Sequence, residues 1–162
     1  MNDLTEIKKI IVKKPLKLDC GKEISNFPLA YETYGKLNEN KDNAILVFHA
    51  LTGDQFASGI NPITKKDGWW KYALGPGKAF DTEKFFVISA NVIGGCMGSY
   101  GPSTINEITS KPLGTDFPVI TINDMVNAIQ SFRFFQNRNF ICCCRRFYGW
   151  NASFTVCFKL SK

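Results

Sequence analysis

The feature that most constrains the fold is an unbroken apolar run that leads into the only histidine of the chain. Residues 44–48 read Ala-Ile-Leu-Val-Phe, and His-Ala-Leu-Thr-Gly-Asp follows at 49–54. A short apolar run bounded by turn-forming residues is typical of a strand buried on both faces of a parallel sheet. The turn after it would then lie at the carboxyl end of the strand, where open α/β sheets bind their ligands.

The segments around this run complete an α/β pattern. Two extended stretches, 9–18 and 26–34, flank the turn Asp19-Cys20-Gly21-Lys22 and predict an antiparallel hairpin. A second apolar run at 85–93 predicts another buried strand, and a helix is expected from an N-cap at Asn123 or Asp124. Strands followed by loops and a helix favour the α/β class.

Charge and cysteine divide the chain near residue 130. Residues 131–162 hold six basic residues, no acidic residue and four of the six cysteines, whereas residues 1–130 carry no net charge. The net charge of +6 therefore belongs to the tail. No apolar run reaches the length of a membrane span, and the N-terminus lacks a signal-peptide core. We expect a cytoplasmic protein with neither a membrane nor a nucleic acid as partner.

Two motifs resemble those of the homoserine O-acetyltransferase family, acyltransferases built on the α/β-hydrolase fold. They are His-Ala-Leu-Thr-Gly at 49–53 and Asn-Val-Ile-Gly-Gly-Cys-Met-Gly-Ser-Tyr-Gly-Pro-Ser at 91–103. The resemblance implies transfer of an acetyl or succinyl group from acyl-CoA to the hydroxyl of L-homoserine in methionine biosynthesis. It implies small-molecule partners, acyl-CoA as co-substrate, no bound cofactor and no metal, and it allows a homodimer.

The resemblance also implies roles for individual residues. The backbone N–H of Leu51 is the candidate oxyanion-hole donor, which would stabilise charge that develops in the transition state. In α/β-hydrolases the catalytic histidine comes late in the chain, so His49 is expected to shape the turn. The strand pattern alone also allows a histidine that only satisfies its own hydrogen bonds. The residues expected to line the substrate pocket are His49, Thr52, Asn91, Gly94, Gly95, Cys96 and Met97.

Other motifs have alternative interpretations. Gly94-Gly-Cys-Met-Gly98 has the spacing of a nucleophile elbow, which would make Cys96 the nucleophile. An elbow needs a helix directly after it, and Tyr100-Gly-Pro opposes one, so a pocket-lining loop is favoured. The pair Trp69-Trp70 is expected to pack rather than to recognise a ligand. The adjacent cysteines 142–144, with Cys157, lack the usual spacing of a zinc site.

The genetic code offers an account of the tail. If it is read one base out of frame, residues 136–152 can decode as K-I-E-(T/I)-L-F-A-V-V-G-G-S-M-G-G-M-Q. That is a strand followed by a Gly-x-Ser-x-Gly elbow. This predicts that residues 1–130 are the N-terminal part of an α/β-hydrolase-type acyltransferase domain. Residues 131–162 would be an out-of-frame tail without a fold of its own, with the serine replaced by Phe147 and Tyr148.

The expected fold class is therefore α/β, an incomplete α/β-hydrolase sheet with an N-terminal hairpin, central parallel strands and a disordered or irregular tail. The triad acid and histidine would lie beyond residue 162, so no catalytic set is complete and the chain is expected to be inactive. Two alternatives stay open. One is an esterase fragment of the same fold, and the other is a non-enzymatic protein with a basic tail.

Overall fold

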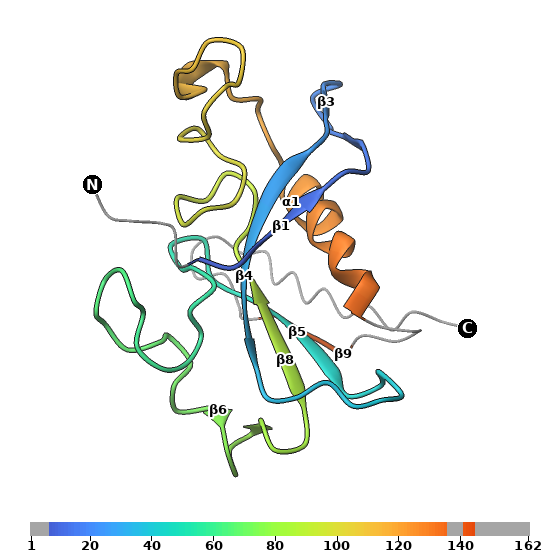
Figure 1. Ribbon diagram of the computed structural model, residues 1–162, viewed down its shortest axis with the longest axis vertical. Helices are drawn as coiled ribbons and strands as arrows, with labels where there is room; N and C mark the ends of the chain where they lie inside the picture. The colour runs from blue at the N-terminus through green and yellow to red at the C-terminus, as the bar shows by residue number, and fades with distance from the viewer. Residues whose placement is uncertain (1–6, 136–140, 145–162) are drawn as a thin grey trace, which may run out of the picture.

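The computed structural model describes residues 7–135 and 141–144 of the chain. Its main sheet has five strands in the order β1-β4-β8-β5-β9 (Figure 1). Their bounds are Lys9–Val12 for β1, Phe27–Tyr34 for β4, Phe86–Ala90 for β8, Ala44–Phe48 for β5 and Ile141–Cys144 for β9. Helix α1, Ile122–Ile129, is followed directly by the 3₁₀ helix η2, Gln130–Phe135.

The N-terminal hairpin is confirmed. Strand β1 pairs antiparallel with β4, and between them β2, Leu16–Lys17, pairs antiparallel with β3, Glu23–Ile24. The turn that joins β2 to β3 is closed by a hydrogen bond from Leu18 N–H to Lys22 O at 2.8 Å. Gly21 in this turn has φ +85°, a conformation that glycine adopts without steric cost.

The central strands are parallel, as expected. Strand β8 pairs parallel with β5, and β9 pairs parallel with the other edge of β5. Strand β4 joins this parallel part to the hairpin by antiparallel pairing with β8. The predicted α/β class, an incomplete sheet with an N-terminal hairpin and central parallel strands, is confirmed.

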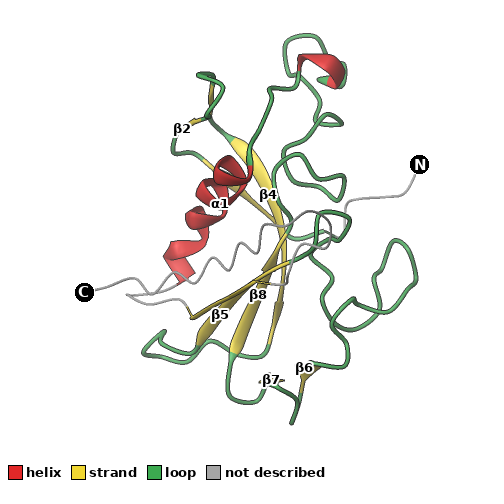
Figure 2. Ribbon diagram, turned by 180° about the vertical axis from the view of Figure 1, so that it is seen from behind, coloured by secondary structure: helices red, strands yellow, loops and turns green. Residues whose placement is uncertain are grey.

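The sheet is covered on both faces, which explains why β5 is apolar at every position. Ala44, Leu46 and Phe48 pack in one core cluster with residues of α1, whereas Ile45 and Val47 pack on the opposite face. That face is covered by the loop after β5, and its stacked Trp69 and Trp70 rings have centroids 5.3 Å apart. Figure 2 shows α1 and this loop on opposite sides of the sheet. The two tryptophans therefore pack, as predicted.

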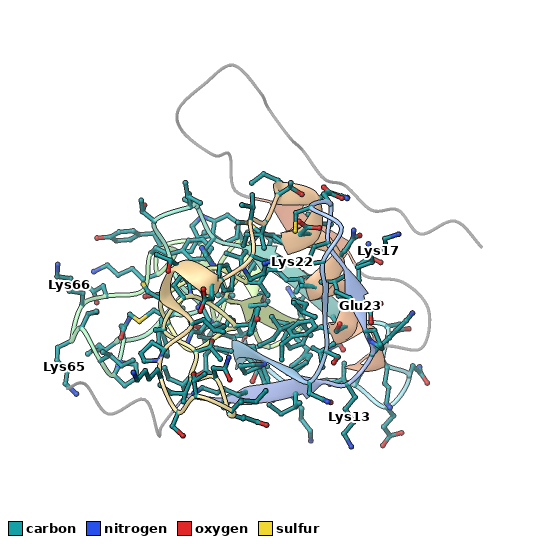
Figure 3. The ribbon with its side chains drawn as sticks, turned by 90° about the horizontal axis from the view of Figure 1, so that it is seen from above. Lys13, Lys17, Lys22, Glu23, Lys65 and Lys66 are labelled. Atoms are coloured by element: carbon teal, nitrogen blue, oxygen red, sulfur yellow. The ribbon has the colours of Figure 1, made fainter. Side chains whose placement is uncertain are left out.

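The remaining elements are short. Strands β6, Leu74–Gly75, and β7, Phe80–Asp81, form a small parallel pair, and η1, Gly114–Asp116, is a 3₁₀ turn. Exposed lysines are spread over separate parts of the surface. Figure 3 shows Lys13, Lys17 and Lys22 near the hairpin, well away from Lys65 and Lys66 on the loop after β5. Among the described residues, no helix is long and apolar enough to cross a membrane.

The start of α1 corrects the predicted N-cap. The N-cap is Thr121, whose side chain accepts a hydrogen bond from Asp124 N–H, while Asp124 accepts one from Thr121 N–H at 2.8 Å. This capping box places Asp124 at N3 rather than at the cap. The prediction of Asn123 or Asp124 was wrong because both lie inside the first turn, and threonine caps a helix nearly as well.

The described part of the predicted tail has some regular structure. Helix η2 extends α1 to Phe135, and Phe132 is fully buried, one turn beyond Ala128 and Ile129. Residues 141–144 form β9, which differs from the expectation of an irregular tail. The edge of β5 opposite β8 presents backbone N–H and C=O groups that can pair with any extended segment. The pairing of β9 with this edge therefore does not depend on a particular side-chain pattern in residues 141–144. Residues 136–140 and 145–162, Phe147 and Tyr148 included, lie outside the described residues.

Candidate active site

The candidate site lies at the carboxyl edge of the parallel strands. Phe48, the last residue of β5, pairs with Ala90, the last residue of β8. Because the two strands run in the same direction, the residues that follow them, His49 and Asn91, emerge side by side. The His-Ala-Leu-Thr-Gly and Asn-Val-Ile-Gly-Gly motifs are therefore brought together by the register of the sheet.

His49 is buried, with 1% of its surface exposed, and it joins the two loops. Its Nδ1 lies 2.7 Å from Ala50 O, and its Nε2 lies 3.1 Å from Asn91 Oδ1. Nε2 also accepts a hydrogen bond from Val92 N–H at 3.3 Å. Burial lowers the pKa of His49, although the hydrogen bond to Ala50 O and the charge of Asp54 oppose the shift. The ring is therefore neutral at pH 7.

The environment of His49 is not that of a catalytic base. Among the described residues, its ring forms no hydrogen bond to a hydroxyl, a thiol or a carboxylate. A base in a catalytic triad needs such a nucleophile on one ring nitrogen and an acid on the other. His49 instead connects backbone groups and the Asn91 side chain, so its position in the structure is that of a residue that holds the turn in place.

The turn after β5 exposes a backbone donor. A hydrogen bond from Gly53 N–H to Ala50 O at 2.7 Å closes the turn and leaves Leu51 and Thr52 at its tip. The Leu51 side chain is 66% exposed, and its N–H has no acceptor among the described residues. A Cβ at Gly53 would lie 2.9 Å from His49 Cβ, so this turn can close against the ring only with glycine there. A turn closed by its own hydrogen bond, with an N–H that no described residue accepts, has the geometry that an oxyanion hole requires.

The second loop, after β8, is fixed from its own side. Ser99 Oγ donates to Asn91 O at 2.6 Å and accepts from Ala30 N–H at 2.9 Å, which ties the loop to β4. Gly94 N–H donates to Tyr100 O at 2.7 Å. Cys96 is exposed and carries a free thiol. Residues 91–113 contain no helix, so the strand-turn-helix geometry of a nucleophile elbow is not present at Cys96.

A third contact links the two loops, and it involves a residue that the sequence analysis did not single out. Gln55 is fully buried, and its Nε2 donates to Met97 O at 3.1 Å. This holds Met97 in the second loop close to the first. A single glutamine in a long loop gives no periodic signal, so burial in the structure was needed to find it. Ser99 lies within the motif at 91–103, but its hydrogen bonds to Asn91 O and from Ala30 N–H could not be foreseen for the same reason.

The predicted site residues thus fall into three groups. His49 and Asn91 are in contact and buried behind the site, while Leu51, Thr52, Gly94 and Cys96 reach the surface and Gly95 and Met97 are half-buried. Phe147 and Tyr148 lie outside the described residues. Strand β9 nevertheless approaches the site, because Phe48 pairs with Cys144 at the same edge.

Comparisons with known proteins agree with this geometry. No family model matches the chain. A homoserine O-acetyltransferase of Pelagibacter ubique (strain HTCC1062) is 77% identical over 128 residues, which are 79% of this chain and 34% of that protein. The crystal structure of homoserine O-acetyltransferase from Bacillus anthracis aligns with TM-score 0.74 and 28% identity, covering 87% of this chain and 40% of that one. Esterase E22 aligns with TM-score 0.67 and 35% identity, over 79% of this chain and 37% of that one.

The sheet order, the site at its carboxyl edge and these structures define the chain as a protein of the α/β-hydrolase fold. Within that class, the matched part of the chain is homologous to the homoserine O-acetyltransferases. The chain spans about a third of the length of the curated relatives that it matches.

Proposed function

We propose that this chain corresponds to the N-terminal part of a homoserine O-acyltransferase. The complete enzyme would transfer an acyl group, acetyl or succinyl, from acyl-CoA to the hydroxyl of L-homoserine, in the cytoplasm and as a step of methionine biosynthesis. The observation that carries this proposal is the 77% identity to the Pelagibacter enzyme over 128 residues. The Leu51 N–H at the carboxyl edge of the sheet, which has no acceptor in the described part of the chain, supports it, because acyl transfer needs an oxyanion donor there.

The proposed roles follow the course of acyl transfer. A serine attacks the thioester carbonyl, and the Leu51 N–H stabilises the negative charge on the carbonyl oxygen as the tetrahedral intermediate forms. The thiol of coenzyme A leaves, and the homoserine hydroxyl then attacks the acyl-serine. The ester bond to the serine oxygen breaks, which releases O-acylhomoserine and restores the serine hydroxyl. Thr52, Gly94, Gly95, Cys96 and Met97 would line the pocket, with His49 and Asn91 behind them.

We further propose that residues 131–162 are read out of frame and that Phe147-Tyr148 occupies the place of the nucleophilic serine. The register of β9 supports this. Cys144, the last residue of β9, pairs with Phe48, so β9 ends at the same edge of the sheet as β5. The decoded Gly-x-Ser-x-Gly at 145–149 begins directly after this strand in the sequence, which is the order that a nucleophile elbow requires. On this proposal the chain itself has no nucleophile and no transferase activity.

A chimera tests the function directly. Residues 1–130 would be joined to the part of the Pelagibacter enzyme that follows its matched stretch, and both chimera and original chain would be assayed with acetyl-CoA, succinyl-CoA and L-homoserine. We expect the chimera to form an O-acylhomoserine and the original chain to form none. Transfer by the original chain would refute the out-of-frame proposal. A folded chimera that transfers nothing would refute the acyltransferase assignment.

Esterase activity is the second candidate, favoured by the 35% identity to esterase E22. The same chimera distinguishes the two activities. A hydrolase would cleave p-nitrophenyl acetate at a rate that homoserine does not change, whereas a transferase would divert the acyl group to homoserine. The gene provides an independent check of the frame. The codons for Phe147 and Tyr148 should be TTC and TAT, because TTT for Phe147 could not encode serine in the shifted frame.

A further inference from the structure

The two ring nitrogens of His49 have neighbours that can play only one role each. Ala50 O, 2.7 Å from Nδ1, can only accept a hydrogen bond. Val92 N–H, 3.3 Å from Nε2, can only donate. Nδ1 must therefore carry the proton, and Nε2 must have a free lone pair. Backbone groups on two different loops thus fix a single neutral tautomer.

The Asn91 side chain completes this assignment. Its Oδ1 lies 3.1 Å from Nε2, which places two acceptors against each other, while Asn91 Nδ2 is buried without a partner among the described residues. A half-turn of the amide removes the clash between the two acceptors, because the amide oxygen and nitrogen have the same shape and exchange places. Oδ1 then takes the buried position without a partner among the described residues. Nδ2 then donates to Nε2. The amide lies against Gly95, where a Cβ would come within 2.7 Å of its Oδ1 atom.

We propose that Asn91 is a positioning residue that holds the imidazole of His49 in the neutral Nδ1–H tautomer, so that the ring locks the Leu51 turn to the loop after β8. Nε2 receives two donors, one from the Asn91 side chain and one from Val92 N–H, and Nδ1 donates to the carbonyl that also closes the turn. The tautomer rests on geometry alone. Its importance for catalysis rests on the proposed function.

Protonation of the ring would break this arrangement. A proton on Nε2 would face two donors, so the Asn91 amide would have to make the reverse half-turn to present its oxygen, and the contact with Val92 N–H would be lost. The charged group that acts on the ring is Asp54, on the loop after β5. Its carboxylate is already bound by Phe56 N–H at 2.8 Å and by Asn61 Nδ2 at 2.9 Å, so it contributes a field rather than a hydrogen bond.

Because the chain has a single histidine, ¹⁵N NMR of the uniformly labelled full-length chain reads this ring without ambiguity. We expect a protonated Nδ1, an unprotonated Nε2 and a titration midpoint below that of a free histidine. Asn91→Asp replaces a donor by a carboxylate, which should favour a proton on Nε2 and raise the midpoint by about one to three pH units. Asn40→Asp adds the same charge on an exposed loop and should leave the midpoint unchanged.

An Nε2–H tautomer in the unsubstituted chain would overturn the proposal, as would an equal midpoint in Asn91→Asp and Asn40→Asp. If Asn91→Asp loses its dispersed amide spectrum, the variant is unfolded and Asn91→Leu is used to test the proposal. This substitution removes the donor to Nε2 without adding charge. The titration midpoint of His49 in Asn91→Leu should lie above that in the unsubstituted chain, and an unchanged midpoint would contradict the proposal. These measurements need no enzymatic activity. A chimera that transfers no acyl group would therefore refute the proposed function while leaving the tautomer to be judged by NMR.

Discussion

The hairpin and helix α1 are joined through one buried carboxylate, and its removal gives the sharpest test of the fold. Asp124 is fully buried and accepts two backbone hydrogen bonds, from Asp19 N–H at 2.9 Å and from Thr121 N–H at 2.8 Å. The Asp19 carboxylate in turn accepts from Thr121 Oγ1 and from Asn123 Nδ2. These contacts connect two segments that lie about a hundred positions apart in the sequence.

The substitution Asp124→Ala would leave both N–H groups without an acceptor. An unpartnered buried donor costs about 1–3 kcal/mol. Both sites are partly buried, so the lower half of that range applies to each and the expected loss is about 2–4 kcal/mol in the free energy of unfolding. This is a large share of the roughly 5–15 kcal/mol that stabilises an ordinary domain. Asp124→Asn keeps one acceptor oxygen and should lose roughly half as much.

Urea unfolding followed by tryptophan fluorescence measures these differences. Asp116→Ala is the matched control, since Asp116 is an exposed aspartate in η1 whose side chain has no hydrogen bond among the described residues. Its stability should change by less than about 0.5 kcal/mol. A loss below about 1 kcal/mol for Asp124→Ala would refute the argument, because the N–H groups would then have found other acceptors at little cost.

Three further predictions concern pH and close backbone approaches. The folded state disfavours protonation of His49, so the unfolded state binds more protons below pH 6.5. The free energy of unfolding should therefore fall as the pH drops from 7 towards 5, with a slope up to about 1.4 kcal/mol per pH unit. In urea titrations, His49→Gln should flatten this slope. Gly53→Ala forces a Cβ to 2.9 Å from His49 Cβ and should lower the free energy of unfolding in urea by about 1–3 kcal/mol. An unchanged urea midpoint would show that the turn does not pack closely against the ring. Gly35 and Gly21 have φ +80° and +85°, but a Cβ at Gly35 would meet Phe85 O at 2.2 Å while one at Gly21 meets nothing within 4 Å. Gly21→Ala should therefore cost about 1–2 kcal/mol by urea unfolding, and Gly35→Ala should cost clearly more, so equal losses would exclude a steric contribution.

The strands could be predicted from the sequence because their patterns are local. The run at 44–48 is apolar at every position because both faces of β5 are covered, and the hairpin is marked by its turn at Asp19-Cys20-Gly21-Lys22. Strand β9 had no comparable signal. Its place depends on the edge that β5 offers, which is a property of the assembled sheet.

The candidate site was only partly accessible to sequence reasoning. The motif at 49–53 was expected at the carboxyl end of a parallel strand, and the structure places it there beside the motif at 91–103, but the sequence did not show which side chains would be buried. Asn91 was expected to line the pocket, and the structure places it behind the loop with 1% exposure, against His49. Gln55 makes one side-chain hydrogen bond, to Met97 O, and Ser99 makes two, with Asn91 O and Ala30 N–H, and no spacing rule identifies such residues. Buried polar side chains of this kind are identified by the hydrogen bonds that they form in the folded structure, and the residues next to them in the sequence do not indicate those partners.

The central position of β5 has a consequence for synthesis on the ribosome. Strand β5 is complete at Phe48, yet both of its partners, β8 and β9, come later in the chain. At translation rates of about 5–20 residues per second, this strand must wait on the order of seconds before β8 emerges beside it. During that interval an entirely apolar segment has neither of its neighbours, so the nascent chain is most vulnerable to aggregation and most dependent on chaperones before Ala90 has been made.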